Sequence, residues 1–157
     1  MLITHSIRIL IVEDDIICAM ALGSVCEAEG HHVVGANNGQ EGLQAFSSAP
    51  FDLVVSDLNM PKLDDRQMIC QLRDEWPCLP IIILTGTRPT GGVGALQGND
   101  PGLTVLLEKP VNGNDLLAAI RSIFWSEPSP AVLRLNPDWW YQNNAASGPI
   151  TRATGAC

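Results

Sequence analysis

The sequence lacks long hydrophobic runs. Its longest near-continuous apolar stretches, Ile81–Leu84 and Thr104–Leu107, fall far short of the roughly 20 residues that a membrane-spanning helix needs. Residues 1–10 also lack the charged flank and the apolar stretch of a signal peptide. We therefore expect neither a transmembrane segment nor a signal peptide.

Basic residues are scarce as well. The chain has 9 Lys and Arg against 17 Asp and Glu, which gives a net charge of −8. An acidic chain without a basic stripe does not attract phosphate backbones, so we expect no nucleic-acid partner. Residues 126–157 are too few for a DNA-binding helix-turn-helix with its own core. We expect them to form a flexible tail, in which the role of Trp139-Trp140-Tyr141 stays open.

The five cysteines lack the spacing of a metal site. Their number is odd, and no Cys-x-x-Cys pair or Cys/His cluster occurs, so neither a zinc site nor a disulfide framework is suggested. Without a signal peptide, the reducing cytoplasm is the expected location. We expect Cys18 and Cys26 to fill the core and His31 to lie at the surface.

What the chain does contain is a regular alternation of two patterns. Of its 157 residues 46% are hydrophobic, enough for one domain, which we place at residues 6–125. Five short β-branched runs predict strands, and because they are continuous runs we expect strands buried on both faces. These runs are Ile7–Val12, His32–Ala36, Asp52–Ser56, Pro80–Leu84 and Leu103–Leu107.

Helical patterns fill most of the gaps between these runs. They cover residues 15–29, 39–48, 64–75 and 113–125, the last with Asn112 or Asn114 as its cap. Residues 86–102 break the rhythm because they are rich in glycine, and they predict at most a degenerate helix. Alternating strands and helices indicate an α/β, doubly wound sheet of five parallel strands.

Polar residues follow these strands at the ends where ligands of such sheets gather. Acidic residues, a threonine and a lysine would meet there, namely Glu13, Asp14, Asp57, Thr85 and Lys109. Two unit charges 4 Å apart repel by about 4 kcal/mol at an effective dielectric near 20. Mg²⁺ would relieve the repulsion among the carboxylates, since it prefers oxygen ligands. An aspartate beside a metal, a lysine and a hydroxyl can accept a phosphoryl group.

Four motifs carry a resemblance to a known family. In order along the chain they read Ile9-Leu10-Ile11-Val12-Glu13-Asp14-Asp15, Val54-Val55-Ser56-Asp57-Leu58-Asn59-Met60-Pro61, Leu84-Thr85-Gly86 and Leu107-Glu108-Lys109-Pro110. The chain resembles the receiver domain of bacterial two-component response regulators, of the stand-alone type, over residues 6–125. The resemblance implies the flavodoxin-like strand order 2-1-3-4-5.

The resemblance also implies a magnesium site. By position, Asp57 resembles the phosphoacceptor, which is also a metal ligand, and Asp14 resembles the direct ligand beside it. Glu13 resembles the second acidic residue, which acts through water. Asn59 resembles the residue whose backbone carbonyl completes the coordination. Asp15 is expected to cap the following helix instead.

A second set of residues resembles the phosphoryl-binding groups. Thr85 resembles the hydroxyl donor, with Thr87 as its rival, and Lys109 resembles the ammonium that holds the phosphoryl oxygens. Lys109-Pro110 resembles the cis peptide of the family. The implied partner is a sensor histidine kinase or a histidine phosphotransfer protein, and the implied role is phosphorylation-dependent protein interaction by a domain that is not a dedicated enzyme.

Three departures concern the output surface. Asp65 stands where the family usually has glycine, Leu106 stands where an aromatic residue is frequent, and residues 86–102 replace the fourth helix. An alternative function is therefore an atypical receiver that binds a partner constitutively. A phosphatase with an aspartyl nucleophile is disfavoured, because it needs a second aspartate where this chain has Asn59.

Overall fold

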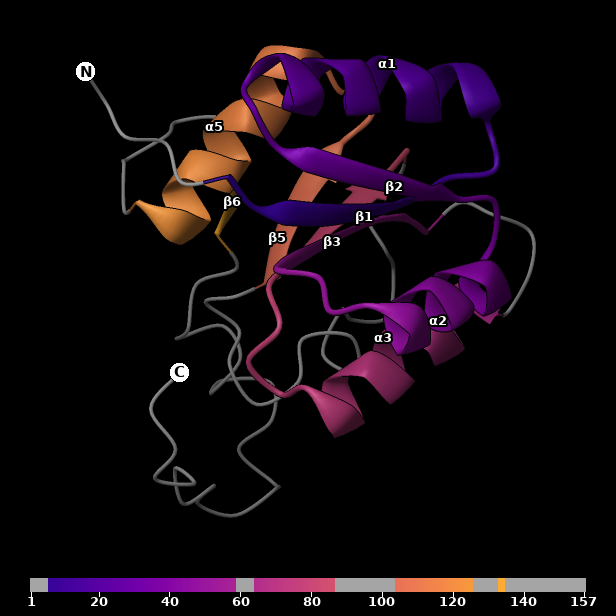
Figure 1. Cartoon of the computed structure of the whole chain (residues 1–157). Coiled ribbons are helices and arrows are strands. Elements are labelled where there is room, and N and C mark those ends of the chain that lie inside the picture. Colours follow the sequence, from indigo (N-terminus) through magenta and orange to yellow (C-terminus); the bar gives the residue numbers. More distant parts are fainter. Residues whose placement is uncertain (1–5, 59–63, 87–103, 126–132, 135–157) are drawn as a thin grey trace.

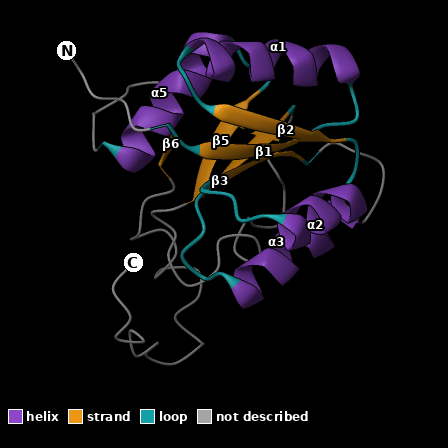
Figure 2. Cartoon of the chain, viewed as in Figure 1, coloured by secondary structure: helices purple, strands orange, loops and turns teal. Residues whose placement is uncertain are grey.

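The computed structural model describes residues 6–58, 64–86, 104–125 and 133–134. A central sheet lies between two layers of helices (Figure 1; Figure 2). Its strands are β1 (Arg8–Val12), β2 (His32–Ala36), β3 (Leu53–Asp57), β4 (Ile81–Thr85), β5 (Thr104–Glu108) and β6 (Leu133–Arg134). The helices are α1 (Ile16–Ala28), α2 (Gly39–Ser48), α3 (Asp64–Glu75) and α5 (Gly113–Phe124).

The strand order confirms the predicted topology and adds one strand. The sheet runs β2-β1-β3-β4-β5-β6, and the first five strands are parallel in the expected order 2-1-3-4-5. The short β6 pairs antiparallel with β5. The prediction of five strands missed β6, because Leu133–Arg134 lies in the stretch assigned to the tail. The predicted degenerate helix lies almost wholly outside the described residues.

Alternation along the strands places apolar side chains on both faces. On β1, Leu10 and Val12 pack with the helices α2 and α3, whereas Ile9 and Ile11 pack with α1 and α5. The same alternation holds on β3 and β4, all of whose residues are buried. Two separate hydrophobic clusters thus hold the helices against the sheet, as the continuous apolar runs predict.

The edge strand β2 departs from that expectation. Three of its five residues are exposed and only Ala36 is buried. The prediction of burial on both faces is therefore wrong for β2, since a strand at the edge of the sheet has a neighbour on one side only. Its composition also contributes, because Gly35 has no side chain that could cover the neighbouring surface.

The helix boundaries agree closely with the sequence patterns. Asp15, Asn38 and Asn112 cap α1, α2 and α5 by accepting hydrogen bonds from backbone N–H groups of the first turn. The last three parallel strands each begin and end one residue later than predicted. That shift makes Asp57 and Thr85 the last residues of β3 and β4.

Two side chains differ from their predicted environments. His31 is buried, not at the surface, and its ring stacks on Trp125 with the centroids 6.4 Å apart. Among the described cysteines, Cys18, Cys26 and Cys70 are free thiols, whereas Cys78 is disulfide-bonded, which the sequence did not predict.

None of the described helices is long and apolar enough to cross a lipid bilayer.

A glycine sets the distance between α2 and the sheet, which gives the first prediction. A Cβ on Gly42 would lie 2.7 Å from the Met68 sulfur and 3.1 Å from Cγ2 of Val12. Gly42→Ala gains about 1 kcal/mol of helix propensity, but overpacking against a central strand costs about 1–3 kcal/mol. We expect urea denaturation to show a net loss of about 1 kcal/mol.

The matched control for this substitution is Gly35→Ala. A Cβ on Gly35 would meet no atom within 4 Å, so the free energy of unfolding should change by less than about 0.5 kcal/mol. A loss of the same size in both variants would contradict the packing argument.

Candidate functional site

The carboxyl ends of three neighbouring strands meet at one edge of the sheet. The register pairs Asp57 with Leu84, the residue before Thr85. The backbone N–H of Leu58 donates to the Leu84 carbonyl at 3.0 Å, and that of Lys109 donates to the Thr85 carbonyl at 2.8 Å. Main-chain hydrogen bonds therefore continue beyond the ends of the strands, and they fix the backbone positions of the residues at this edge.

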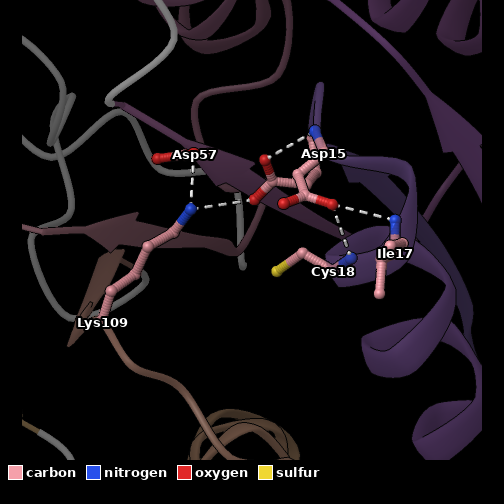
Figure 3. Close-up of polar contacts among 6 residues, drawn as sticks. Asp15, Ile17, Cys18, Asp57 and Lys109 are labelled. Carbon is pink, nitrogen blue, oxygen red and sulfur yellow. Dashed lines mark hydrogen bonds and ion pairs between the residues drawn. The ribbon is translucent and has the colours of Figure 1, made fainter.

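Lys109 bridges two carboxylates that are distant in sequence. Its Nζ lies 2.6 Å from Oδ2 of Asp57 and 3.1 Å from Oε2 of Glu13 (Figure 3). The carboxylates are almost fully buried, with side-chain exposures of 4% and 1%, whereas the lysine is 28% exposed. The ammonium can therefore reach solvent, and it supplies both carboxylates with a counter-charge. The Lys109-Pro110 peptide is cis, as predicted.

Glu13 is held on both of its oxygens. Oε1 accepts a hydrogen bond from the backbone N–H of Asp15 at 3.1 Å, and Oε2 accepts from Lys109. Burial raises the pKa of Glu13, with a smaller contribution from the nearby Asp57 carboxylate, and these outweigh the opposing hydrogen bonds. The carboxylate is thus fixed in place by the chain before any cation binds.

Asp15 caps α1, as the sequence predicts. Its Oδ1 accepts hydrogen bonds from the backbone N–H groups of Ile17 at 2.9 Å and Cys18 at 3.1 Å (Figure 3). This geometry directs the Asp15 carboxylate toward the helix N-terminus, where it is stabilising. The two neighbouring aspartates therefore have different surroundings, and only Asp14 is grouped with the other acidic residues of this edge.

Three carboxylates form a cluster that fits a hard cation. Glu13, Asp14 and Asp57 each offer an oxygen, and these oxygens lie within 4.8 Å of one another. Asp14 is exposed, so a cation there would keep bound water. An all-oxygen donor set open to water suits Mg²⁺ rather than a soft metal. The backbone carbonyl of Asn59, the fourth predicted ligand, lies outside the described residues.

Lys109 stays charged within this cluster. Burial alone would lower the pKa of Lys109, but its hydrogen bonds to Asp57 and Glu13 outweigh burial and raise the pKa above its ordinary value. Among the described residues, one ammonium faces the three carboxylates of this cluster, so an excess of negative charge remains. That excess favours a divalent cation on one side of Asp57, while Lys109 occupies the other side.

Thr85 is buried at the end of β4, on the strand next to Asp57. This position agrees with its predicted place at the carboxyl edge. Its rival Thr87 lies outside the described residues, so the structure does not compare the two.

The position of Cys18 beside the acidic residues was not predicted from the sequence. Cys18 does pack against the core, as expected, but it is only half-buried and its side chain lies at the acidic edge (Figure 3). Burial and then the negative charge of Glu13 raise the pKa of the Cys18 thiol. The sequence did contain a sign of this position: Cys18 lies in the first turn of α1, directly after the acidic residues that follow β1.

Comparison with known proteins gives one family. The family model for the response regulator receiver domain matches residues 9–121. The chain is 36% identical over 115 residues to the transcriptional regulatory protein GlrR of Escherichia coli (strain K12), which covers 72% of this chain and 25% of that protein. The chain spans between about a quarter and somewhat over half of the length of the curated relatives it matches.

Solved structures show the same fold. The chemotaxis response regulator CheY4 of Vibrio cholerae has a TM-score of 0.65 at 24% identity, covering 75% of this chain and 98% of that one. The response regulator TrrA of Thermotoga maritima, solved in complex with Mg(2+)-BeF, has a TM-score of 0.62 at 26% identity, covering 74% of this chain and 97% of that one.

The different surroundings of Asp14 and Asp15 give the second prediction. Asp14→Ala removes a carboxylate from the cluster, so we expect the Mg²⁺ affinity to fall by about tenfold or more, equivalent to about 1.4 kcal/mol. Asp15→Ala removes a helix cap and should cost about 1 kcal/mol of stability, with the Mg²⁺ affinity nearly unchanged. Isothermal titration with MgCl₂ and urea denaturation measure the two effects separately. Equal Mg²⁺ affinity of Asp14→Ala and the parent would refute the assignment.

Proposed function

Since this chain belongs to the response regulator receiver domain family, we propose that it is the phosphoacceptor of a His-to-Asp phosphorelay, phosphorylated on Asp57. The observation that carries this proposal is the ion pair of Asp57 with Lys109 beside the cluster of Glu13, Asp14 and Asp57. The arrangement combines the buried carboxylate of Asp57 with the Lys109 ammonium on one side and a place for a metal cation on the other.

The chemistry follows from these positions. A carboxylate oxygen of Asp57 attacks the phosphorus of a phosphohistidine donor, the P–N bond breaks, and an acyl phosphate forms. The imidazole leaves with the bonding electron pair and takes up a proton. Asp14, Asp57 and the Asn59 carbonyl would hold Mg²⁺, with Glu13 acting through water, and the bound ion would neutralise negative charge during the transfer.

Two further residues bind the oxygens of the phosphoryl group once it is on Asp57. Lys109, already within 2.6 Å of Asp57, moves its hydrogen bond to a phosphoryl oxygen, because that group carries more negative charge than the carboxylate. The Thr85 hydroxyl donates to another phosphoryl oxygen from the neighbouring strand. The chain thus takes part in its own phosphorylation and dephosphorylation without being a dedicated enzyme.

The partners follow from the same chemistry. The phosphodonor is a sensor histidine kinase or a histidine phosphotransfer protein, and the proposed location is the cytoplasm. Relatives such as GlrR are named transcriptional regulators and are longer than this chain, so the expected absence of a nucleic-acid partner stays a prediction for these 157 residues. The output is a protein interaction that depends on phosphorylation.

Constitutive binding remains the second candidate, because of one described residue. Leu106 is buried in the cluster that faces α2 and α3, and it has neither the ring nor the hydroxyl of the aromatic residue that is frequent at this position. Leu106 therefore lacks the ring through which an aromatic residue could pass on a conformational change. A partner affinity that is equal with and without beryllofluoride would favour this second function.

Phosphorylation of Asp57 is the third prediction. Intact-mass spectrometry after treatment with acetyl phosphate and Mg²⁺ should show one added phosphoryl group on the parent chain. The group should be absent in Asp57→Asn, which keeps the size of the side chain but removes the nucleophilic carboxylate. It should also be absent from the parent when EDTA replaces Mg²⁺.

Asp52→Asn is the matched control for this experiment. Asp52 lies at the other end of β3, directly before Leu53, and its carboxylate accepts a hydrogen bond from the backbone N–H of Arg8 at 2.8 Å, away from the acidic cluster. This variant should be phosphorylated like the parent. An unchanged mass of the parent with metal and donor present would overturn the proposal.

A further inference from the structure

A cleft opens between α1 and the edge strand β2. Its volume is about 380 Å³, at the lower end of the range of ligand-binding pockets. Ile11 and Val33 line it from the sheet, and Ile16, Ala19 and Met20 line it from α1. Lys109 is not among the lining residues, and of the acidic cluster only Glu13 is. The cleft is therefore a surface beside the candidate phosphorylation site, not the site itself.

Two glycines keep the cleft hollow. A Cβ on Gly35 would meet nothing within 4 Å, and a Cβ on Gly23 would make only an ordinary contact, 3.5 Å from Cγ1 of Val33. Neither glycine has a positive φ angle or a close neighbour that requires the absence of a side chain. Because neither glycine has a side chain, the space between α1 and β2 stays open. A larger residue at either position would fill it.

Large apolar side chains stand exposed at the rim. Ile16 is 63% and Met20 66% exposed, although both line the cleft. Exposed apolar groups that surround a hollow are typical of sites that receive an apolar side chain of a partner. Methionine suits such a site, since its flexible thioether adapts to the shape of what it contacts.

The charges around the cleft indicate the nature of its occupant. Among the described residues, the charged ones that line the cleft are Glu13 and Glu27, and no lysine or arginine lines it. The exposed Asp14 and Asp15 follow Glu13 directly, at the same end of α1. A second copy of this chain would bring an equally acidic rim and a net charge of −8 against this one, so self-association is opposed by like charges.

We propose that the cleft between α1 and β2 is a docking site for a basic amphipathic segment of another protein. One large apolar side chain of that segment enters the cleft between Met20 and Val33. Lysine or arginine residues on either side of it face Glu27 and the acidic end of α1. The cleft shares Glu13 with the acidic cluster, but its apolar walls lie outside that cluster, so this docking does not require phosphorylation of Asp57.

The test uses a defined probe on the full chain. The probe is a synthetic amphipathic helical peptide of leucine and lysine, and its control is the peptide with glutamate in place of every lysine. In titrations of the ¹⁵N-labelled chain we expect the leucine–lysine peptide to shift the amide signals of Met20, Val33 and Gly35. The leucine–glutamate peptide should produce no such shifts, and added NaCl should weaken the binding.

Three variants test whether the peptide binds in the cleft or elsewhere on α1. Gly35→Val fills the cleft with a residue that strands accommodate well and should raise the dissociation constant at least about tenfold. Met20→Ala removes one wall and should weaken binding in the same direction, which keeps the test valid if Gly35→Val fails to fold. Ile17→Ala is the matched control, because Ile17 is 81% exposed on the same helix but does not line the cleft.

Several outcomes would overturn the proposal. Parent-like affinity in both Gly35→Val and Met20→Ala would exclude the cleft as the docking site. Equal binding of the two peptides would exclude the acidic rim as the selective feature. If sedimentation shows that the parent chain is a dimer and that Gly35→Val is a monomer, the occupant is a second copy of this chain.

Discussion

The pairing of one lysine with two buried carboxylates is the interaction on which this edge of the molecule depends. Glu13 follows β1 and Asp57 ends β3, both are almost completely removed from water, and Lys109 contacts both. Such carboxylates are costly unless a cation compensates them. Among the described residues Lys109 supplies this cation, and the excess of negative charge in the cluster is one that a divalent ion can neutralise. A stable fold and the proposed reactive site therefore share the same three side chains.

The parallel sheet makes this pairing possible. β1, β3 and β5 end at one edge, so residues 13, 57 and 109 meet although long stretches of chain separate them. The buried strands hold these ends rigidly, because their side chains pack into helices on both faces. The edge strand β2 is covered less well, and the cleft beside α1 is the consequence. The proposed phosphoryl chemistry and the proposed docking surface thus arise from two parts of the same sheet.

The sequence predicted the parts of the structure that follow from short-range patterns and strand ends. The cap Asp15 and the end of β1 were predicted, the ends of β3 and β4 were predicted to within one residue, and Asn112 was one of two predicted caps, because capping and burial act over a few residues. The exposure of β2 was not predictable from its apolar run, since it depends on having no strand on its outer side. The burial of His31 depends on a contact with a distant element, through Trp125. The place of Cys18 beside Glu13 is a local feature, since the two residues are close in sequence, and it could have been inferred from the position of Cys18 in the first turn after Asp15. Asn59 and the glycine-rich stretch lie outside the described residues, so those predictions stay predictions.

A double-mutant cycle between Lys109 and Asp57 tests the central claim most directly. The free energy of unfolding is measured by urea denaturation for the parent, Lys109→Met, Asp57→Asn and the double variant, without Mg²⁺. If Lys109 compensates the buried Asp57 carboxylate, Lys109→Met should cost at least about 1 kcal/mol more in the parent than in the Asp57→Asn background, within the range for directly contacting residues. Costs that agree within about 0.3 kcal/mol in the two backgrounds would show that the pair is not coupled, and would contradict this account of the site.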